Sequence, residues 1–283
     1  MTRATRFSDV VAGHGEGPVW WPGEGLRITD AYQGEVVSLA ADGAVARRTR
    51  VGSFVGAFRP RTGGGLVAAA LRSFVLVDPD GTTHDLGELW PDEGRRMNDG
   101  ATAPDGAFLC GSMQTGDPTG GAALYRLGVD GAVSTVLTGV SVSNGPAWSP
   151  GGRRVYYNDT PTSHVDVFDV AEDGSWHDRR TLADLGEDSP DGMTIDTEGR
   201  LWVAVWGGGQ VRCLDPESGA VLDVVEVEGP TQTSACTFGG DDLDQLFITT
   251  SRENLPPGAD PLAGSLFRAD VGVRGRPVRE FAG

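Results

Sequence analysis

The segment SPGGRRVYY (residues 149–157) joins a turn made of proline and glycine to a short apolar run. Proline and glycine interrupt regular structure, and a short apolar run bounded by such turns is typical of a strand. The same pattern occurs six times, with copies about forty-five residues apart. The turns of the six copies are Trp21-Pro22-Gly23, Arg59-Pro60, Ala103-Pro104-Asp105-Gly106, Ser149-Pro150-Gly151, Asp196-Thr197-Glu198-Gly199 and Gly239-Gly240-Asp241.

A second, alternating run follows each copy and ends in a further turn. Phe74 to Val77 precede Pro79-Asp80-Gly81, and Leu124 to Leu127 precede Val129-Asp130-Gly131. Alternation at period two predicts half-buried strands, and Asp-Gly pairs supply the positive φ angles that hairpin turns need. A β-sandwich would not need a constant period, and a solenoid would need shorter repeats. The sequence therefore predicts an all-β fold, a six-bladed β-propeller with four antiparallel strands per blade, as a single domain over residues 1–283.

The strand-like piece from Ser8 to Val11 lies outside the six units. We expect it to complete the last blade and so to lock the ring, because radial closure leaves few exposed strand edges. A ring closed in this way needs no partner, and we expect a monomer.

Composition excludes several classes of function. The net charge is −17, and all 23 basic residues are arginine. An acidic surface repels phosphate backbones, so we expect no nucleic-acid partner. The chain has no 18-residue apolar run and no apolar N-terminal stretch, which argues against a membrane partner and against a secretory signal. Three cysteines without C-x-x-C spacing, Cys110, Cys213 and Cys236, predict buried free thiols and a reducing, cytoplasmic location.

One position recurs at the same register in every repeat, six residues before the second position of the turn. The residues found there are Glu16, Phe54, Asn98, Asn144, Asp191 and Ser234. The first strand of each propeller blade lines the central channel, so these side chains are expected to converge on the axis at one height. Five of the six are polar, and four carry carbonyl or carboxylate oxygens.

Two of the converging residues, Glu16 and Asp191, carry carboxylates. Two carboxylates in a narrow channel repel each other unless they are protonated or neutralised by a cation. The pattern therefore predicts one divalent metal ion with oxygen ligands. The absence of His and Cys from the ring favours Ca²⁺, while Mn²⁺, Mg²⁺, Fe²⁺ and Zn²⁺ remain alternatives. The competing interpretation is that Asp and Asn before Gly are ordinary turn residues, and that a polar channel only holds water.

Motifs around these positions resemble those of the SMP-30/gluconolactonase/luciferin-regenerating-enzyme family. The resemblance spans nearly the whole chain and keeps the order of the motifs. The matching segments are Gly15-Glu16-Gly17-Pro18-Val19-Trp20, Arg96-Met97-Asn98-Asp99-Gly100, Ser143-Asn144-Gly145-Pro146-Ala147-Trp148-Ser149-Pro150, Pro190-Asp191-Gly192-Met193-Thr194-Ile195-Asp196, Leu201 to Gly209, Phe238-Gly239-Gly240 with Leu246 to Thr250, and Pro261-Leu262-Ala263-Gly264-Ser265-Leu266-Phe267.

The resemblance implies a six-bladed propeller and a metal-dependent hydrolase, typically a sugar lactonase. It implies that Glu16, Asn144 and Asp191 bind the metal, with Asn98 at or near it. It also implies that Arg96 and Asn98 contact the substrate, a small lactone. A bound divalent ion would polarise the lactone carbonyl and lower the pKa of a water molecule, and Asp191 is the expected general base.

Several alternatives remain open at this stage. The same metal site could act on an organophosphate or on an ester or lactone of secondary metabolism, because loops set the substrate on a shared scaffold. A non-catalytic binding propeller with a structural metal is the third hypothesis. The loop from Gln114 to Gly121, with Asp117 as its acid, leaves the substrate undetermined. Asp99 could transfer a proton or only form a turn, and His14 could support the site or only the fold.

Overall fold

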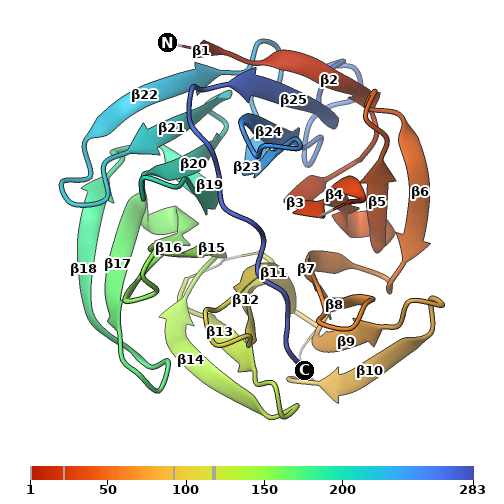
Figure 1. The fold of residues 1–283 in the computed structure, drawn as a ribbon, viewed down its shortest axis with the longest axis vertical. Coiled ribbons are helices and arrows are strands. Elements are labelled where there is room, and N and C mark those ends of the chain that lie inside the picture. Colours follow the sequence, from red (N-terminus) through yellow and green to blue (C-terminus); the bar gives the residue numbers. More distant parts are fainter. Residues whose placement is uncertain (1, 22, 92, 117–118) are drawn as a thin grey trace.

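The strands form six sheets around a central axis and follow one another around it in chain order (Figure 1). The computed structural model describes residues 2–21, 23–91, 93–116 and 119–283. Pro22 of the first turn and Asp117 of the loop from Gln114 to Gly121 lie outside this part of the chain. The arrangement confirms the predicted all-β, six-bladed propeller with four antiparallel strands per blade.

Each of the first three blades is a simple meander that starts at the axis and ends at the rim. Blade one contains β3 (Gly15–Trp21), β4 (Gly25–Asp30), β5 (Glu35–Leu39) and β6 (Val45–Arg50). Blade two contains β7 (Val55–Pro60), β8 (Leu66–Ala70), β9 (Ser73–Val77) and β10 (Thr83–Glu88). Blade three contains β11 (Arg95–Thr102), β12 (Phe108–Gln114), β13 (Ala122–Leu127) and β14 (Val133–Val140).

The last three blades follow the same plan, and the N-terminal strands join them at the rim. Blade four contains β15 (Ser143–Trp148), β16 (Arg154–Asp159), β17 (His164–Val170) and β18 (Trp176–Asp184). Blade five contains β19 (Ser189–Ile195), β20 (Leu201–Trp206), β21 (Gln210–Leu214), β22 (Val221–Glu226) and the short β1 (Thr2–Arg3). Blade six contains β23 (Thr233–Gly239), β24 (Gln245–Thr250), β25 (Ser265–Asp270) and β2 (Thr5–Val10).

The N-terminal segment closes the ring, as the sequence predicted. Strand β2 pairs antiparallel with β25, and the Leu266 N–H donates to Ser8 Oγ at 2.9 Å. The paired segment begins at Thr5, earlier than the predicted piece. Strand β1 adds a parallel pairing with β22 that the repeat pattern does not reveal. Residues 2–10 therefore connect the outer edges of blades five and six.

The core consists of apolar layers between neighbouring blades. Trp202 of blade five meets Phe238 of blade six edge to face, with ring centroids 5.9 Å apart. Phe74 and Phe108 make the same kind of contact between blades two and three. Each fully buried side chain of this size contributes about 1.5–3 kcal/mol to folding. Cysteines 110, 213 and 236 are buried and free, as predicted.

All six inner strands share one irregularity. The pairing between the first and second strand of each blade shifts register at the predicted axial position or immediately beside it. In two blades, a glycine with positive φ accompanies the shift: Gly17 (φ 48°) after Glu16, and Gly145 (φ 42°) after Asn144. A bulge of this kind redirects a side chain. Here Asn98, Asp191 and Ser234 fall inside the shift, while Glu16 and Asn144 are the last paired residues before it.

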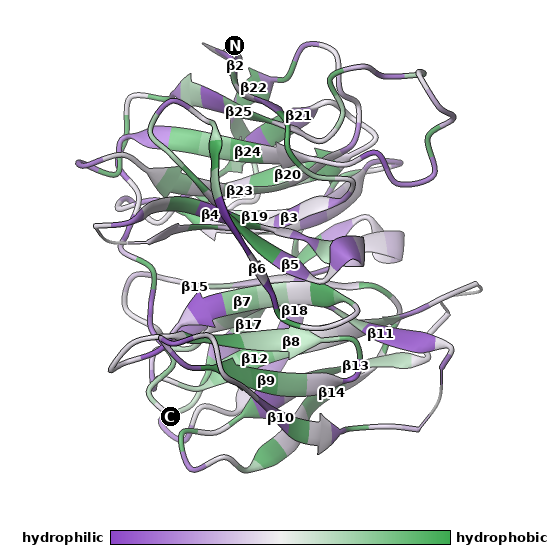
Figure 2. Cartoon of the chain, turned by 90° about the vertical axis from the view of Figure 1, so that its right-hand side faces the viewer, coloured by the Kyte–Doolittle hydropathy of each residue, from purple (hydrophilic) through white to green (hydrophobic). Residues whose placement is uncertain are grey.

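The two ends of the axial channel are built differently. One end lies where the inner strands begin. It is formed by the loops that follow the second strand of each blade, including the 3₁₀ turns η1 (Ala31–Gln33) and η2 (Thr160–Thr162). At the other end, residues 271–283 leave β25 and cross the middle of the ring (Figure 1). The side view places the C terminus on the face opposite the coiled turns (Figure 2). We call residues 271–283 the strap. Within the described residues, no helix has the length and apolarity to cross a membrane.

Candidate metal centre

The predicted metal-binding side chains come from three inner strands: Glu16 from β3, Asn144 from β15 and Asp191 from β19. Asn144 and Asp191 are 3% and 6% exposed. Burial raises the pKa of Glu16 from an ordinary value near 4.5 to about 8, with a further contribution from the charge of Asp99. Burial and the charge of Glu16 raise the pKa of Asp191 well above its usual range. The site thus concentrates negative charge where water cannot screen it.

Backbone and amide contacts hold these three groups in place. The Gly17 N–H donates to Glu16 Oε2 at 3.2 Å, inside the bulge. Asn144 Nδ2 donates to Thr160 Oγ1 at 2.8 Å, so the first residue of η2 fixes the orientation of this amide. The main chain at Asp191 is held by Asn158, whose Nδ2 donates to the Asp191 carbonyl at 2.6 Å.

Arg96 and Asn98, the predicted substrate-binding pair, contact each other. Arg96 Nη1 donates to Asn98 Oδ1 at 2.7 Å, while Asn98 Nδ2 donates to Asn144 Oδ1 at 3.0 Å. The Arg96 guanidinium lies over the ring of Phe54 at 4.6 Å and faces the ring of Tyr32 at 5.6 Å. Asn98 therefore links Arg96 to Asn144, and its amide oxygen faces Arg96. Phe54, the apolar member of the axial set, supports the guanidinium.

The remaining axial residue and its neighbours have structural contacts. Ser234 Oγ donates to the Gly15 carbonyl at 2.6 Å, which ties blade six to blade one. Asp99 is buried, and its two oxygens accept the N–H groups of Gly100 at 2.7 Å and Gly145 at 2.9 Å. Burial raises the pKa of Asp99. Asp99 thus joins the bulges of blades three and four.

Tyr32, His14 and Glu253 form a wall beside the axial set, and of these only His14 was considered in the sequence analysis. Tyr32, in η1, donates its hydroxyl to Glu253 Oε1. His14 Nδ1 lies 2.7 Å from Ser251 Oγ, and its Nε2 lies 3.9 Å from Glu253 Oε2. Burial lowers the pKa of His14 to about 4, so its ring is neutral at pH 7. The carboxylate of Glu253 adds to the negative potential acting on the axial carboxylates.

Repeat alignment missed this wall because its members do not share a strand register. Tyr32 and Glu253 follow the second strands of their blades, at different offsets, as does Thr160, which holds Asn144. Comparing those loops blade by blade, instead of the inner strands, would have drawn attention to them. The rim of a propeller channel is formed by such connections, and loops carry specificity on a rigid scaffold.

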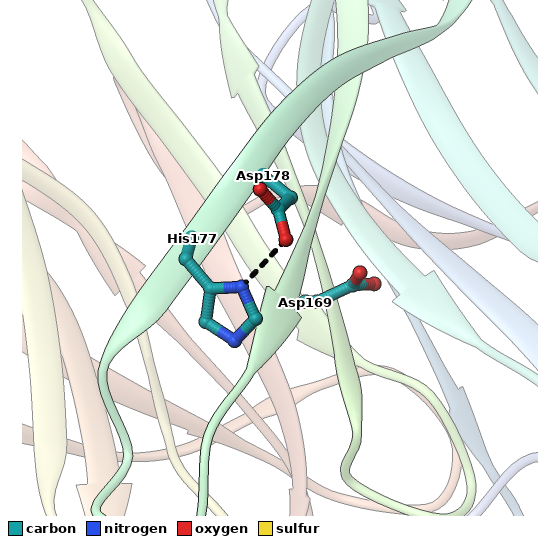
Figure 3. A group of neighbouring side chains, drawn as sticks. All are labelled: Asp169, His177 and Asp178. Carbon is teal, nitrogen blue, oxygen red and sulfur yellow. Dashed lines mark hydrogen bonds and ion pairs between the residues drawn. The ribbon is translucent and has the colours of Figure 1, made fainter.

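A separate group of possible metal ligands lies on the outside of blade four. Asp169 of β17 and His177 and Asp178 of β18 approach one another there (Figure 3). His177 Nδ1 is 2.9 Å from Asp178 Oδ2, and Arg180 Nη2 donates to Asp169 Oδ1 at 3.0 Å. An arginine thus already balances one of the two carboxylates. This exposed cluster has the contacts of a surface ion-pair group and is not part of the axial set.

The axial residues suit a hard divalent cation. Two carboxylates and an amide oxygen are the ligand types that Ca²⁺ prefers. A cation between them would remove the cost of burying two like charges, which the raised pKa values of Glu16 and Asp191 reflect. Asn144 Oδ1 is held by Asn98, so the amide is already oriented.

A family model described as SMP-30/Gluconolactonase/LRE-like region matches residues 14–252, a span that contains every predicted site residue. The chain belongs to this family. It is 35% identical to 6-deoxy-6-sulfogluconolactonase from Pseudomonas putida over 95% of each chain. It is 33% identical to pentonolactonase XacC from Haloferax volcanii over 96% of each chain.

The structural comparison agrees with this membership of the SMP-30/gluconolactonase/LRE-like family. The crystal structure of regucalcin from Agrobacterium tumefaciens, described as a calcium-binding protein, superposes with a TM-score of 0.92 at 26% identity. The match covers 100% of this chain and 98% of that one. The family resemblance read from the axial motifs is confirmed.

Proposed function

We propose that this chain is a metal-dependent hydrolase of small lactones, with the axial residues as its reaction centre. The observation that carries the proposal is a pair of carboxylates, the half-buried Glu16 and the buried Asp191, beside an arginine held between two aromatic rings. Two family members of similar length are named as sugar lactonases. A lactone carries both a carbonyl and hydroxyl groups, and the site offers partners for each.

In this proposal Glu16, Asn144 and Asp191 hold one divalent ion, with Ca²⁺ favoured by the all-oxygen ligands and by the calcium-binding relative. When bound, such an ion polarises a carbonyl group and makes an adjacent water molecule more acidic. Asn98 keeps the Asn144 oxygen oriented through its own amide nitrogen. Its amide oxygen, engaged by Arg96, fits a role in substrate contact better than a role as fourth ligand.

Asp191 is assigned as the general base. Its carboxylate is buried, and Asn158 holds the main chain that carries it. A cation at the site favours the ionised form of Asp191, which is the form able to accept a proton. A positioned base of this kind contributes about 10²–10⁴-fold to the rate.

Arg96 is assigned to orienting the substrate. The stacking against Phe54 and the bond to Asn98 hold its planar guanidinium, while Nη2 remains 3.5 Å from the Tyr32 hydroxyl. A fixed fork of donors suits neighbouring hydroxyl and carbonyl oxygens. Glu253, which accepts the Tyr32 hydroxyl, supplies a carboxylate acceptor for a further hydroxyl.

The test is an assay of the purified protein against a panel of neutral aldonolactones, with bound metal measured in parallel. We expect about one divalent ion per chain, acid release from at least one lactone, and loss of turnover after chelation that the ion restores. The matched control is Asp169→Asn, which removes a carboxylate of the surface cluster and should leave turnover unchanged. Turnover that survives both chelation and Asp191→Asn would refute the proposal. Organophosphates and simple esters in the same panel test the other substrates open to this scaffold.

A further inference from the structure

A cavity occupies the axial channel at the end opposite the metal centre. It measures about 410 Å³ and is lined by the later residues of the inner strands, among them Thr102, Trp148 and Thr194. The strap closes this end. The Thr197 N–H donates to the Arg274 carbonyl at 2.9 Å on one side of the ring, and the Thr62 N–H donates to the Phe281 carbonyl at 2.9 Å on the other.

Three arginines line this cavity from two directions. Arg59 comes from β7, while Arg276 and Arg279 come from the strap. Arg59 Nη1 donates to the Phe58 carbonyl at 2.6 Å, and Arg276 Nη2 donates to the Pro150 carbonyl at 3.4 Å. Across the described ranges, no carboxylate lies within ion-pair distance of any of the three. The neighbouring Arg274, outside the cavity, is paired with Asp242 at 3.5 Å.

The positive charge of these arginines is poorly compensated. Burial lowers the pKa of Arg59, and burial together with the charge of Arg276 lowers the pKa of Arg279. The cavity lining contains one acid among the described residues, Asp99, and both of its oxygens already accept backbone N–H groups. The charge of Asp99 acts on Arg59 without forming an ion pair. In a chain of net charge −17, three arginines that form no ion pair with a described carboxylate at one cavity are not a result of composition. All three arginines are half-buried, and cations withdrawn from water normally have an anion beside them.

We propose that this cavity binds a small oxyanion with two negative charges, the chemistry shared by phosphate monoesters and dicarboxylates. Guanidinium groups match the planar edges of carboxylates and phosphates and bind them through paired hydrogen bonds. A cavity of about 410 Å³ falls within the range used for small metabolites. The anion would contact Arg59 on the ring and Arg276 and Arg279 on the strap, and so fasten the strap to blade two.

The proposal predicts that such anions stabilise the folded protein independently of lactone turnover. The metal-loaded protein is heated in 10 mM sodium sulfate, in 10 mM disodium succinate, and in sodium chloride of equal ionic strength. Sulfate represents the phosphate group and succinate represents the dicarboxylate. We expect one or both anions to raise the midpoint of unfolding by about 3 °C over chloride. No rise with either anion would overturn the proposal.

Paired variants locate the effect. The double variant Arg276→Gln/Arg279→Gln should lose the rise, whereas Arg274→Gln, on the same strap but outside the cavity, should keep it. If the double variant melts too early for a comparison, calorimetric titration of the folded variant at 15 °C replaces it, and at least a tenfold weaker affinity is expected. An undiminished rise, or unchanged affinity, in the double variant would show that the anion binds elsewhere.

Discussion

Glu16 and Asp191 show how much a single pair of residues determines in this molecule. Asp191 is buried and Glu16 is half-buried, and each has a pKa raised chiefly because removal from water penalises its charge. Without a bound cation, this pair of carboxylates destabilises the folded protein. A cation makes it favourable, so the same two residues that weaken the metal-free protein should dominate the stability of the loaded one.

Replacing Asp191 by Asn should therefore have opposite effects on activity and on metal-free stability. We expect turnover of a lactone to fall by at least 100-fold, because both a ligand and the base are lost. The metal-free variant should melt at a higher temperature than the metal-free native protein, because one buried charge is gone. Calorimetry with and without chelator checks this. A variant that is less stable than the native chain in both states would contradict it.

Metal binding should also depend on pH in a defined direction. The pKa of Glu16 is about 8 in the folded, metal-free protein and near 4.5 in water. Protonation of Glu16 therefore contributes fully to the stability of the folded, metal-free protein below pH 4.5, and this contribution to stability is lost as the pH rises towards 8. A metal ion must displace that proton. We expect Ca²⁺ affinity to rise between pH 5.5 and 7.5, and calorimetry in buffers of different ionisation enthalpy to detect proton release. A pH-independent affinity would contradict the raised pKa.

At the scale of the strand, the bulge of each inner strand positions the axial residue. Gly145 has a φ of 42°, and a Cβ atom there would lie 3.0 Å from the Met193 nitrogen. Gly17 has a similar φ of 48°, but its nearest neighbour would be the Gly56 carbonyl at 3.5 Å. Alanine at Gly17 would therefore meet only the cost of the backbone conformation, whereas alanine at Gly145 would meet that cost and the cost of crowding.

Gly145→Ala should destabilise the protein more than Gly17→Ala. A non-glycine residue in the left-handed region costs about 1–2 kcal/mol, and Gly145→Ala adds a contact that forces β15 away from β19. We expect a loss of about 2 kcal/mol or more at Gly145 and about 1 kcal/mol at Gly17, measured by urea unfolding. Equal losses would mean that the crowding at Gly145 is relieved without cost.

The inner strands were predictable from the sequence because they repeat. The spacing of the turns located Glu16, Asn144 and Asp191 at one register, and the structure has them on equivalent strands. The wall formed by Tyr32 and Glu253 could not be found in this way. These residues lie 221 positions apart and meet only because the ring closes. The same is true of the strap, whose arginines line the same cavity as Arg59 without any periodic signal.

At the scale of the whole molecule, closure of the ring depends on the N-terminal ten residues. Removing residues 2–10 deletes the outer strand of blade six, together with the bond between Ser8 and Leu266. We expect the midpoint of thermal unfolding to fall by more than about 10 °C, because β25 becomes an exposed edge. Removing only residues 2–3 deletes the short parallel pairing with β22 and should cost about 2 °C or less. Similar losses in the two truncations would show that β2 is not what closes the ring.

The position of the metal ion is the most direct test of the whole interpretation. Crystals grown with Mn²⁺, which shares oxygen ligands with Ca²⁺ and scatters anomalously, locate the ion without assumptions about activity. We predict one strong anomalous peak on the propeller axis, within 2.5 Å of oxygen atoms from Glu16, Asn144 and Asp191. An empty axis, or a peak confined to Asp169, His177 and Asp178 on the outside of blade four, would contradict it.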